Sequence, residues 1–266
     1  MSEMMLQNPH LEGDAFAWEG GPTGALLIHG FTATTAEIRP LARTLYGRGY
    51  AVAGPLLPGH RARPADVNRY RWQDWVQIVA EAYDRLAARC DRVFVGGEST
   101  GAVLSLYLAS EHPEIAGLLL YAPALRLTLR PIDALKLSLL APFVPYLPKP
   151  RRGTRTATHA DALWQGYTVS PLKGTRELLR LQRVVRARLS RVRQPVFIAQ
   201  GKLDRTVDPR APQMILDGVR SSVKELHWFD RSAHCVLIDD EWEEVTARTL
   251  RFLDRVMSGA AGGFFQ

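Results

Sequence analysis

The amino-acid sequence predicts an α/β fold in which a mostly parallel sheet is flanked by helices. Short apolar runs alternate with segments of helical periodicity along most of the chain, as in proteins built from repeated strand and helix units. The chain has 266 residues, 46% of them hydrophobic, which is enough to bury one full core. Strands are predicted near residues 25–29, 50–53, 93–97, 117–121, 195–200 and 225–229.

Residues 71–88 are predicted to form a helix that packs on this sheet. Their apolar side chains recur at helical spacing and therefore share one face. Trp72 and Trp75 belong to that face, so we expect this pair in the core.

A serine stands where one predicted strand turns into a helix. Residues 97–101 read GESTG, with an apolar strand before them and a helical run after them. Glycines two positions on either side of Ser99 allow a tight turn that holds the serine exposed, whereas side chains there would clash. The pattern predicts a nucleophile elbow, although glycines can also serve a purely structural turn.

A nucleophilic serine needs a histidine base and a carboxylate that orients it, in the chain order serine, acid, histidine. Asp204 follows the predicted strand 195–200, and His234 follows the strand 225–229. Loops at the carboxyl ends of parallel strands open on one edge of the sheet. We therefore expect Ser99, Asp204 and His234 to converge.

Several neighbouring residues could compete for these roles. His227 lies in mid-strand and is expected to pack against another layer. Asp208 precedes a proline and is expected to be a helix N-cap, but it is also the second candidate for the acid. Glu98 and Asp230 are expected to be surface or turn carboxylates, and Cys235 a packing residue.

A second glycine-containing loop, residues 29–31, follows the first predicted strand. Its Phe31 N–H and the Thr100 N–H are predicted to form the oxyanion hole, which requires two preorganised donors. His29 is expected to be a structural histidine, although it is kept among the candidates for substrate contact.

Residues 123–192 interrupt the alternation of strands and helices. The segment is much longer than one connecting helix, so we expect an inserted cap between two parts of the core, 1–122 and 193–266. Pro142, Pro145 and Pro148 favour short, angled helices over one long rod.

The first part of this cap is rich in large apolar side chains. They are expected either to pack on the core or to line an acyl pocket above Ser99 and contact lipid surfaces. The candidates for substrate contact here are Leu139, Phe143 and Val144.

Together these motifs resemble the bacterial carboxylesterase and monoacylglycerol lipase branch of the α/β-hydrolases. The resemblance spans nearly the whole chain and implies an α/β-hydrolase fold with Ser99 as nucleophile, Asp204 as acid and His234 as base. It also implies Phe31 and Thr100 as oxyanion donors. Glu98 and Thr100 depart from the residues usual in that branch. The motifs that carry the resemblance are HGF at 29–31, PGH at 58–60, Trp72 with Trp75, GESTG at 97–101, GKLD at 201–204 and SAH at 232–234.

Composition narrows the range of partners. The formal charge of +7 comes mostly from scattered arginines, and the cluster between Arg183 and Arg193 contains no aromatic residues, so nucleic-acid binding is not expected. Cys90 and Cys235 match no metal-binding spacing, and we expect neither a metal nor a cofactor. The start of the chain lacks the features of a signal peptide, so we expect a soluble, cytoplasmic monomer.

The sequence therefore predicts a serine hydrolase that acts on monoesters with an apolar acyl chain. Thioesterase or acyltransferase chemistry would use the same three residues, and a non-catalytic binding scaffold is the remaining alternative. Epoxide and haloalkane hydrolysis on this fold would need a carboxylate at position 99, where this chain has serine.

Overall fold

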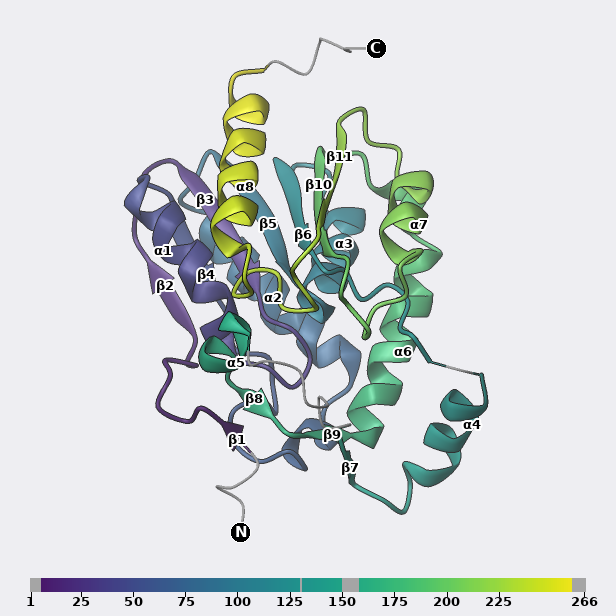
Figure 1. Ribbon diagram of the computed structural model, residues 1–266. Helices are drawn as coiled ribbons and strands as arrows, with labels where there is room; N and C mark the ends of the chain where they lie inside the picture. The colour runs from purple at the N-terminus through teal and green to yellow at the C-terminus, as the bar shows by residue number, and fades with distance from the viewer. Residues whose placement is uncertain (1–5, 130, 150–157, 260–266) are drawn as a thin grey trace.

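The computed structural model describes residues 6–129, 131–149 and 158–259. Within them, a seven-stranded sheet has the order β11-β10-β6-β5-β3-β4-β2 (Figure 1). Neighbouring strands run parallel, except that β2 is antiparallel to β4. The strands are β2 (Phe16–Trp18), β3 (Thr23–Ile28), β4 (Ala51–Gly54), β5 (Arg92–Glu98), β6 (Gly117–Tyr121), β10 (Val196–Gly201) and β11 (Lys224–Phe229).

All six predicted strands are present, so the predicted fold class is confirmed. The strand β2 was not predicted, because three residues at a sheet edge give too short a pattern to recognise. Two small antiparallel pairs lie outside the main sheet. They join β1 (Leu6–Gln7) to β8 (Gly166–Tyr167) and β7 (Tyr146–Pro148) to β9 (Val169–Pro171).

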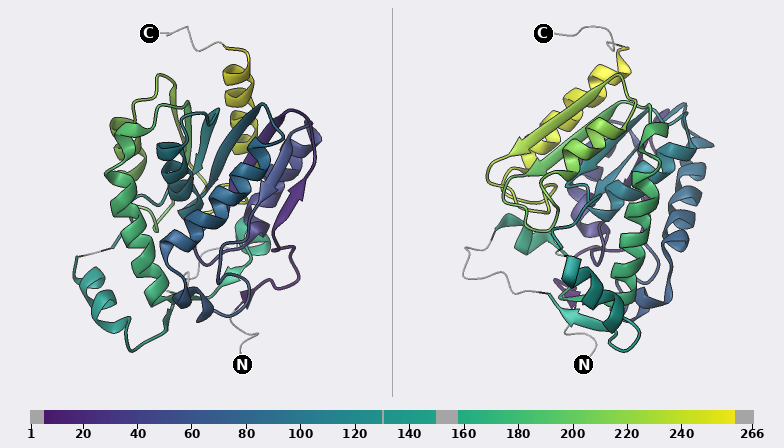
Figure 2. Two further views of the ribbon diagram at one scale, coloured as in Figure 1. Left: turned by 180° about the vertical axis from the view of Figure 1, so that it is seen from behind. Right: turned by 90° about the vertical axis from the view of Figure 1, so that its right-hand side faces the viewer.

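Helices cover both faces of the sheet (Figure 2). One buried cluster joins α1 and α8 to one face, and another joins α2, α3, α6 and α7 to the opposite face. Successive side chains of each strand alternate between these clusters, as strand geometry requires. The helices are α1 (Arg39–Gly47), α2 (Trp72–Ala87), α3 (Thr100–Glu111), α4 (Pro131–Leu140), α5 (His159–Leu163), α6 (Leu172–Arg186), α7 (Ala211–Gly218) and α8 (Trp242–Met257).

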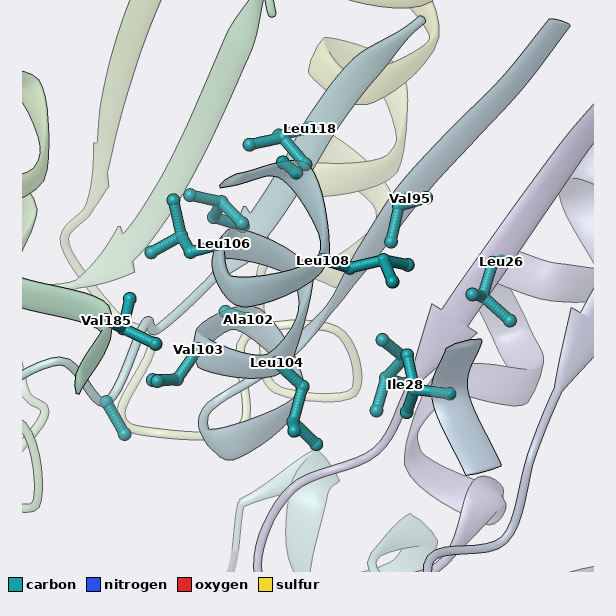
Figure 3. Close-up of a cluster of buried hydrophobic side chains, with 14 of the residues drawn as sticks. Leu26, Ile28, Val95, Ala102, Val103, Leu104, Leu106, Leu108, Leu118 and Val185 are labelled. Atoms are coloured by element: carbon teal, nitrogen blue, oxygen red, sulfur yellow. The ribbon is translucent and has the colours of Figure 1, made fainter. Parts of the chain in front are cut away.

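Helix α3, which begins next to Ser99, lies inside the second cluster. Leu26, Val95 and Leu118 of the sheet gather on one side of it, and Val185 of α6 lies on the other (Figure 3). Because α3 is covered on both sides, it is apolar almost all round, unlike a surface helix. This burial fixes the end of the helix that carries the elbow.

The predicted helix at 71–88 corresponds to α2. Trp75 is completely buried, and Trp72 is partly buried against the same cluster. The prediction of a core tryptophan pair is thus confirmed for Trp75 and met in part by Trp72.

The long connection between β6 and β10 contains α4, α5, α6 and the short strands β7, β8 and β9. Helix α6 packs on the core through Leu178, Leu181 and Val185. On α4 and the turn after it, Leu139 is 64% exposed and Phe143 is 85% exposed. Packing on the core therefore does not account for these two side chains.

Among the residues that the structure describes, no helix combines the length and apolar character needed to cross a bilayer.

Candidate active site

Ser99 lies at a tight turn between β5 and α3. Its backbone has φ 57° and ψ −110°, a conformation that residues other than glycine rarely adopt. A Cβ atom added at Gly97 or Gly101 would lie 2.2 Å or 2.0 Å from the carbonyl oxygen of Ile28. The two glycines are needed because β3 passes directly beside the turn.

Ser99, His234 and Asp204 form a continuous hydrogen-bonded chain. The Nε2 atom of His234 is 3.0 Å from the Oγ atom of Ser99, and its Nδ1 atom is 2.8 Å from Oδ2 of Asp204. The residues follow the carboxyl ends of β5, β10 and β11, which meet at one edge of the sheet. The three residues singled out in the sequence thus lie together.

Asp204 is held by more than the histidine. Its Oδ2 also accepts a hydrogen bond from Gln200 at 2.9 Å, while Oδ1 accepts from the backbone N–H groups of Thr206 at 2.7 Å and Val207 at 3.1 Å. Burial raises the pKa of Asp204, but the charge and hydrogen bond of His234 and these N–H groups outweigh it and hold the pKa below its usual value. Asp204 therefore stays ionised beside the imidazole.

Gln200 was not singled out in the sequence. It is a polar residue at the end of an apolar strand that is buried throughout, and that was the available signal. A buried amide needs partners, and here one partner is the carboxylate.

The two predicted oxyanion donors belong to segments that meet at Ser99. Thr100 is the first residue of α3, so its N–H has no acceptor within the helix. The loop of residues 29–31 lies against the elbow, since a Cβ atom on Gly30 would be 3.2 Å from Cβ of Ser99. Both segments can therefore supply donors to an oxygen bound at the serine.

His29, the first residue of this loop, is fully buried. Its Nε2 accepts a hydrogen bond from the Leu57 N–H at 3.0 Å, so Nδ1 carries the proton and donates to the Gly30 carbonyl at 2.8 Å. Burial and the neighbouring His60 lower the pKa of His29 to about 3. With both ring nitrogens bonded inside the protein, this neutral histidine supports the loop.

The other candidates for substrate contact lie on the segment after β6, where Leu139 and Phe143 are exposed and Val144 is partly buried.

The competing histidine and cysteine have packing roles. His227 lies beside Phe197, and its ring nitrogens contact Glu225 and Arg248. Cys235 is buried with Ala160 and Ile238.

The predictions for two carboxylates were wrong. Asp208 is not the N-cap of α7, because that helix begins at Ala211 after Arg210; instead Asp208 pairs with Arg126 and Arg210. Glu98 is not a surface or turn carboxylate but is completely buried, with Oε1 accepting from the Leu237 N–H at 3.2 Å. Asp230, by contrast, is exposed, as expected, and it pairs with Lys202.

A second buried carboxyl group, that of Glu37, lies close to Glu98. One oxygen or sulfur atom from each of Glu37, Glu98 and Cys235 lies within 4.8 Å of the others, a donor set that could hold a metal ion. Glu37 was not singled out in the sequence, and Glu98 was expected at the surface or in a turn. Their signal was weak because nothing in the local pattern shows that a carboxylate is buried.

A serine on a strand-to-helix elbow, followed in the chain by an acid and a histidine at one edge of a parallel sheet, defines the α/β-hydrolase class. Within this class, the model of the family described as serine aminopeptidase, S33, matches residues 24–241, and the chain belongs to that family. It is a hydrolase of the esterase and lipase type, as the sequence motifs predicted.

Known relatives match over nearly their full length. The thermostable monoacylglycerol lipase of Bacillus sp. strain H-257 is 33% identical over 250 residues, covering 94% of this chain and 98% of the relative. The carboxylesterase of Bacillus subtilis strain 168 is 26% identical over 243 residues, covering 91% of this chain and 96% of that relative. A solved structure from work on two metagenome-derived lipolytic enzymes, LipS and LipT, superposes on this chain with a TM-score of 0.82 and is 31% identical in sequence. The match covers 92% of this chain and 99% of the solved chain.

Proposed function

We propose that this enzyme hydrolyses carboxylic monoesters with an apolar acyl chain, from short- and medium-chain esters to monoacylglycerols, through an acyl-enzyme on Ser99. The observation that carries the proposal is the hydrogen-bonded chain from Ser99 through His234 to the buried Asp204. The names of the relatives support the choice of ester substrates.

In the first half of the proposed reaction, His234 takes the proton of the Ser99 hydroxyl as its oxygen attacks the ester carbonyl. The Phe31 and Thr100 N–H groups stabilise the negative charge that develops on the carbonyl oxygen. His234 then gives its proton to the departing alcohol, and an acyl group remains on Ser99.

In the second half, His234 takes a proton from water, which attacks the acyl carbonyl and releases the acid. Asp204 holds the imidazole in the tautomer with the proton on Nδ1 and stabilises its positive form in both halves. No step of this scheme requires a cofactor or a metal.

We assign the binding of the acyl chain and the approach to lipid to the inserted segment, residues 123–192. Its exposed large apolar side chains include Leu139 and Leu140 at the end of α4, and Phe143 and Leu147 on the segment after it. Apolar surface of this kind is typical of sites that contact lipid.

The substrate class can be tested with p-nitrophenyl esters from acetate to palmitate and with 1-monoacylglycerols. We expect turnover across part of this series, and the chain length of maximal kcat/KM distinguishes a general carboxylesterase from a monoacylglycerol lipase. A fluorophosphonate should add one mass tag at Ser99 and none to Ser99→Ala. A folded protein that is neither tagged nor active on the series would point to the binding scaffold. One that is tagged but cleaves only thioesters, or transfers the acyl group to another alcohol, would point to the thioesterase or acyltransferase.

Phe143 provides a separate test of lipid contact. We expect Phe143→Ser to lower the rate on emulsified monoacylglycerol by up to about thirtyfold, since burying a phenyl ring in lipid is worth about 2 kcal/mol. The rate on dissolved p-nitrophenyl acetate should stay the same. Trp228→Ser, which removes an exposed aromatic residue from β11, is the matched control. Equal losses in both variants would contradict a role for this surface.

A further inference from the structure

Two buried carboxyl groups lie directly behind the proposed catalytic residues. Glu98 is the last residue of β5 and precedes Ser99, while Glu37 comes from the helical turn Thr35–Ile38 that leads into α1. Their relative exposures are 0% and 2%. The mechanism described above uses neither group.

Glu37 is attached to the loop that carries a proposed oxyanion donor. Its Oε1 accepts a hydrogen bond from the Gly30 N–H at 2.5 Å, and Gly30 immediately precedes Phe31. The carboxylate also attracts the positive charges of His234 and Lys149, and it accepts a hydrogen bond from Trp164. Glu37 therefore acts on both the position of the loop and the charge of the imidazole.

Glu98 has a different environment. Its Oε1 accepts from the Leu237 N–H, while Oε2 has no hydrogen-bond partner among the residues that the structure describes. The carboxylates that face it are Glu37, Asp204 and Asp239. A negative charge on Glu98 would be buried beside three acids, and within the described ranges no cation pairs with it, so ionisation is strongly unfavourable.

We propose that Glu37, as a carboxylate, positions the oxyanion loop through the Gly30 N–H, and that Glu98 beside it stays protonated so that the pair carries a single negative charge. This inference rests on the proposed function, because it concerns the oxyanion hole of Ser99. Glu37 is a positioning residue in this scheme, since it acts through the backbone of Gly30.

The pair makes the loop sensitive to pH. Burial raises the pKa of Glu37 to about 7, partly offset by the Gly30 hydrogen bond, and burial with the charge of Glu37 raises the pKa of Glu98 well above its usual range. As the pH falls through about 7, Glu37 gains a proton, becomes a weaker acceptor for Gly30 and ceases to attract the imidazolium. Above that pH the carboxylate is present and the loop is held.

The first test measures how fast a fluorophosphonate labels Ser99 as a function of pH. We expect Glu37→Leu, which removes the acceptor, to slow labelling at pH 8 by about a hundredfold, the usual effect of losing one oxyanion donor. Glu37→Gln keeps a neutral acceptor, so its labelling rate at pH 8 should fall less than that of Glu37→Leu. Its labelling rate should also lack the component that titrates near pH 7 in the wild type. In ester hydrolysis, kcat should fall while KM stays the same. Glu19→Gln, at an exposed carboxylate, is the matched control.

The second test detects the proton itself. The carbonyl stretch of a protonated carboxyl group is separated in the infrared from that of a carboxylate. We expect this band in the wild type at pH 8, its retention in Ser99→Ala, and its loss in Glu98→Gln. Because Ser99→Ala is used, this result does not depend on catalysis.

The proposal is overturned if Glu37→Leu labels as fast as the wild type, if the infrared band is missing at pH 8, or if Glu98→Gln leaves it unchanged. A divalent metal found bound to Glu37, Glu98 and Cys235 in the purified protein would also overturn it. Failure of the proposed function looks different, since the wild type would then not be labelled at all.

Discussion

Replacing His234 with alanine is expected to lower kcat for ester hydrolysis by about a million-fold, and the double variant with Ser99→Ala should be no slower than either single variant. In the proposed mechanism the two side chains act as one unit, because the serine is a poor nucleophile without a base and the base has no role without the serine. A remaining rate above that of water comes from substrate binding and the oxyanion donors.

Asp204→Asn is expected to have a smaller effect, a loss of about ten-thousand-fold in kcat. The asparagine amide would donate to Nδ1 of His234 and so favour the wrong tautomer, while the charge that stabilises the imidazolium is lost. The hydrogen bonds from Thr206 and Val207 to Oδ1 can persist, so the loop keeps its geometry.

Steady-state kinetics with p-nitrophenyl butyrate measure these effects, and circular dichroism checks that the variants are folded. His227→Ala is the matched control, since that histidine lies within β11, the strand that precedes His234, but is bonded to Glu225 and Arg248. We expect it to keep kcat within a few-fold. A His234→Ala variant with substantial activity would refute the assignment of the base.

The second large effect is on folding. Gly101→Ala is expected to destabilise the protein by about 3 kcal/mol, because the new Cβ atom would lie 2.0 Å from the carbonyl oxygen of Ile28. The neighbour is backbone in the middle layer of the fold and cannot move aside as a flexible side chain could. Urea unfolding followed by fluorescence measures the loss.

Gly47→Ala is the control for the glycine replacement itself. Gly47 ends α1, and a Cβ atom added there would meet nothing within 4 Å. We expect unchanged stability or a gain of up to about 1 kcal/mol, since alanine lowers the entropy of the unfolded chain. Equal unfolding midpoints for the two variants would show that the contact with β3 is not as tight as described.

The parallel strands could be predicted because buried strands are continuous apolar runs bounded by turn residues, as at 196–199 and 93–95. The same runs placed Ser99, Asp204 and His234 at strand ends, and parallel topology then required them to lie on one edge. Their catalytic roles stay a prediction until they are tested by the variants above.

Other parts of the site could not be predicted, because they depend on contacts between distant segments. The burial of Glu98 and Glu37 follows from the packing of the loops at Gly30 and Leu237 around them, and no local pattern encodes that packing. The support of Asp204 by Gln200, by contrast, is local, since the two residues are four positions apart, and a polar side chain in the buried strand β10 was its available signal. The extent of the cap stays a prediction, since α6 belongs to the same layer of helices as α3.

The arrangement of the sheet also has a consequence for how the enzyme forms. Ser99 and His234 are 135 residues apart in the chain, and the strands that carry them are separated in the sheet by β6 and β10. Closing such long loops is entropically costly and comes late in folding. A chain that has paired only β3, β4 and β5 already holds the serine but has no base. Regain of hydrolysis during refolding therefore reports the last long-range pairing rather than collapse or the first secondary structure.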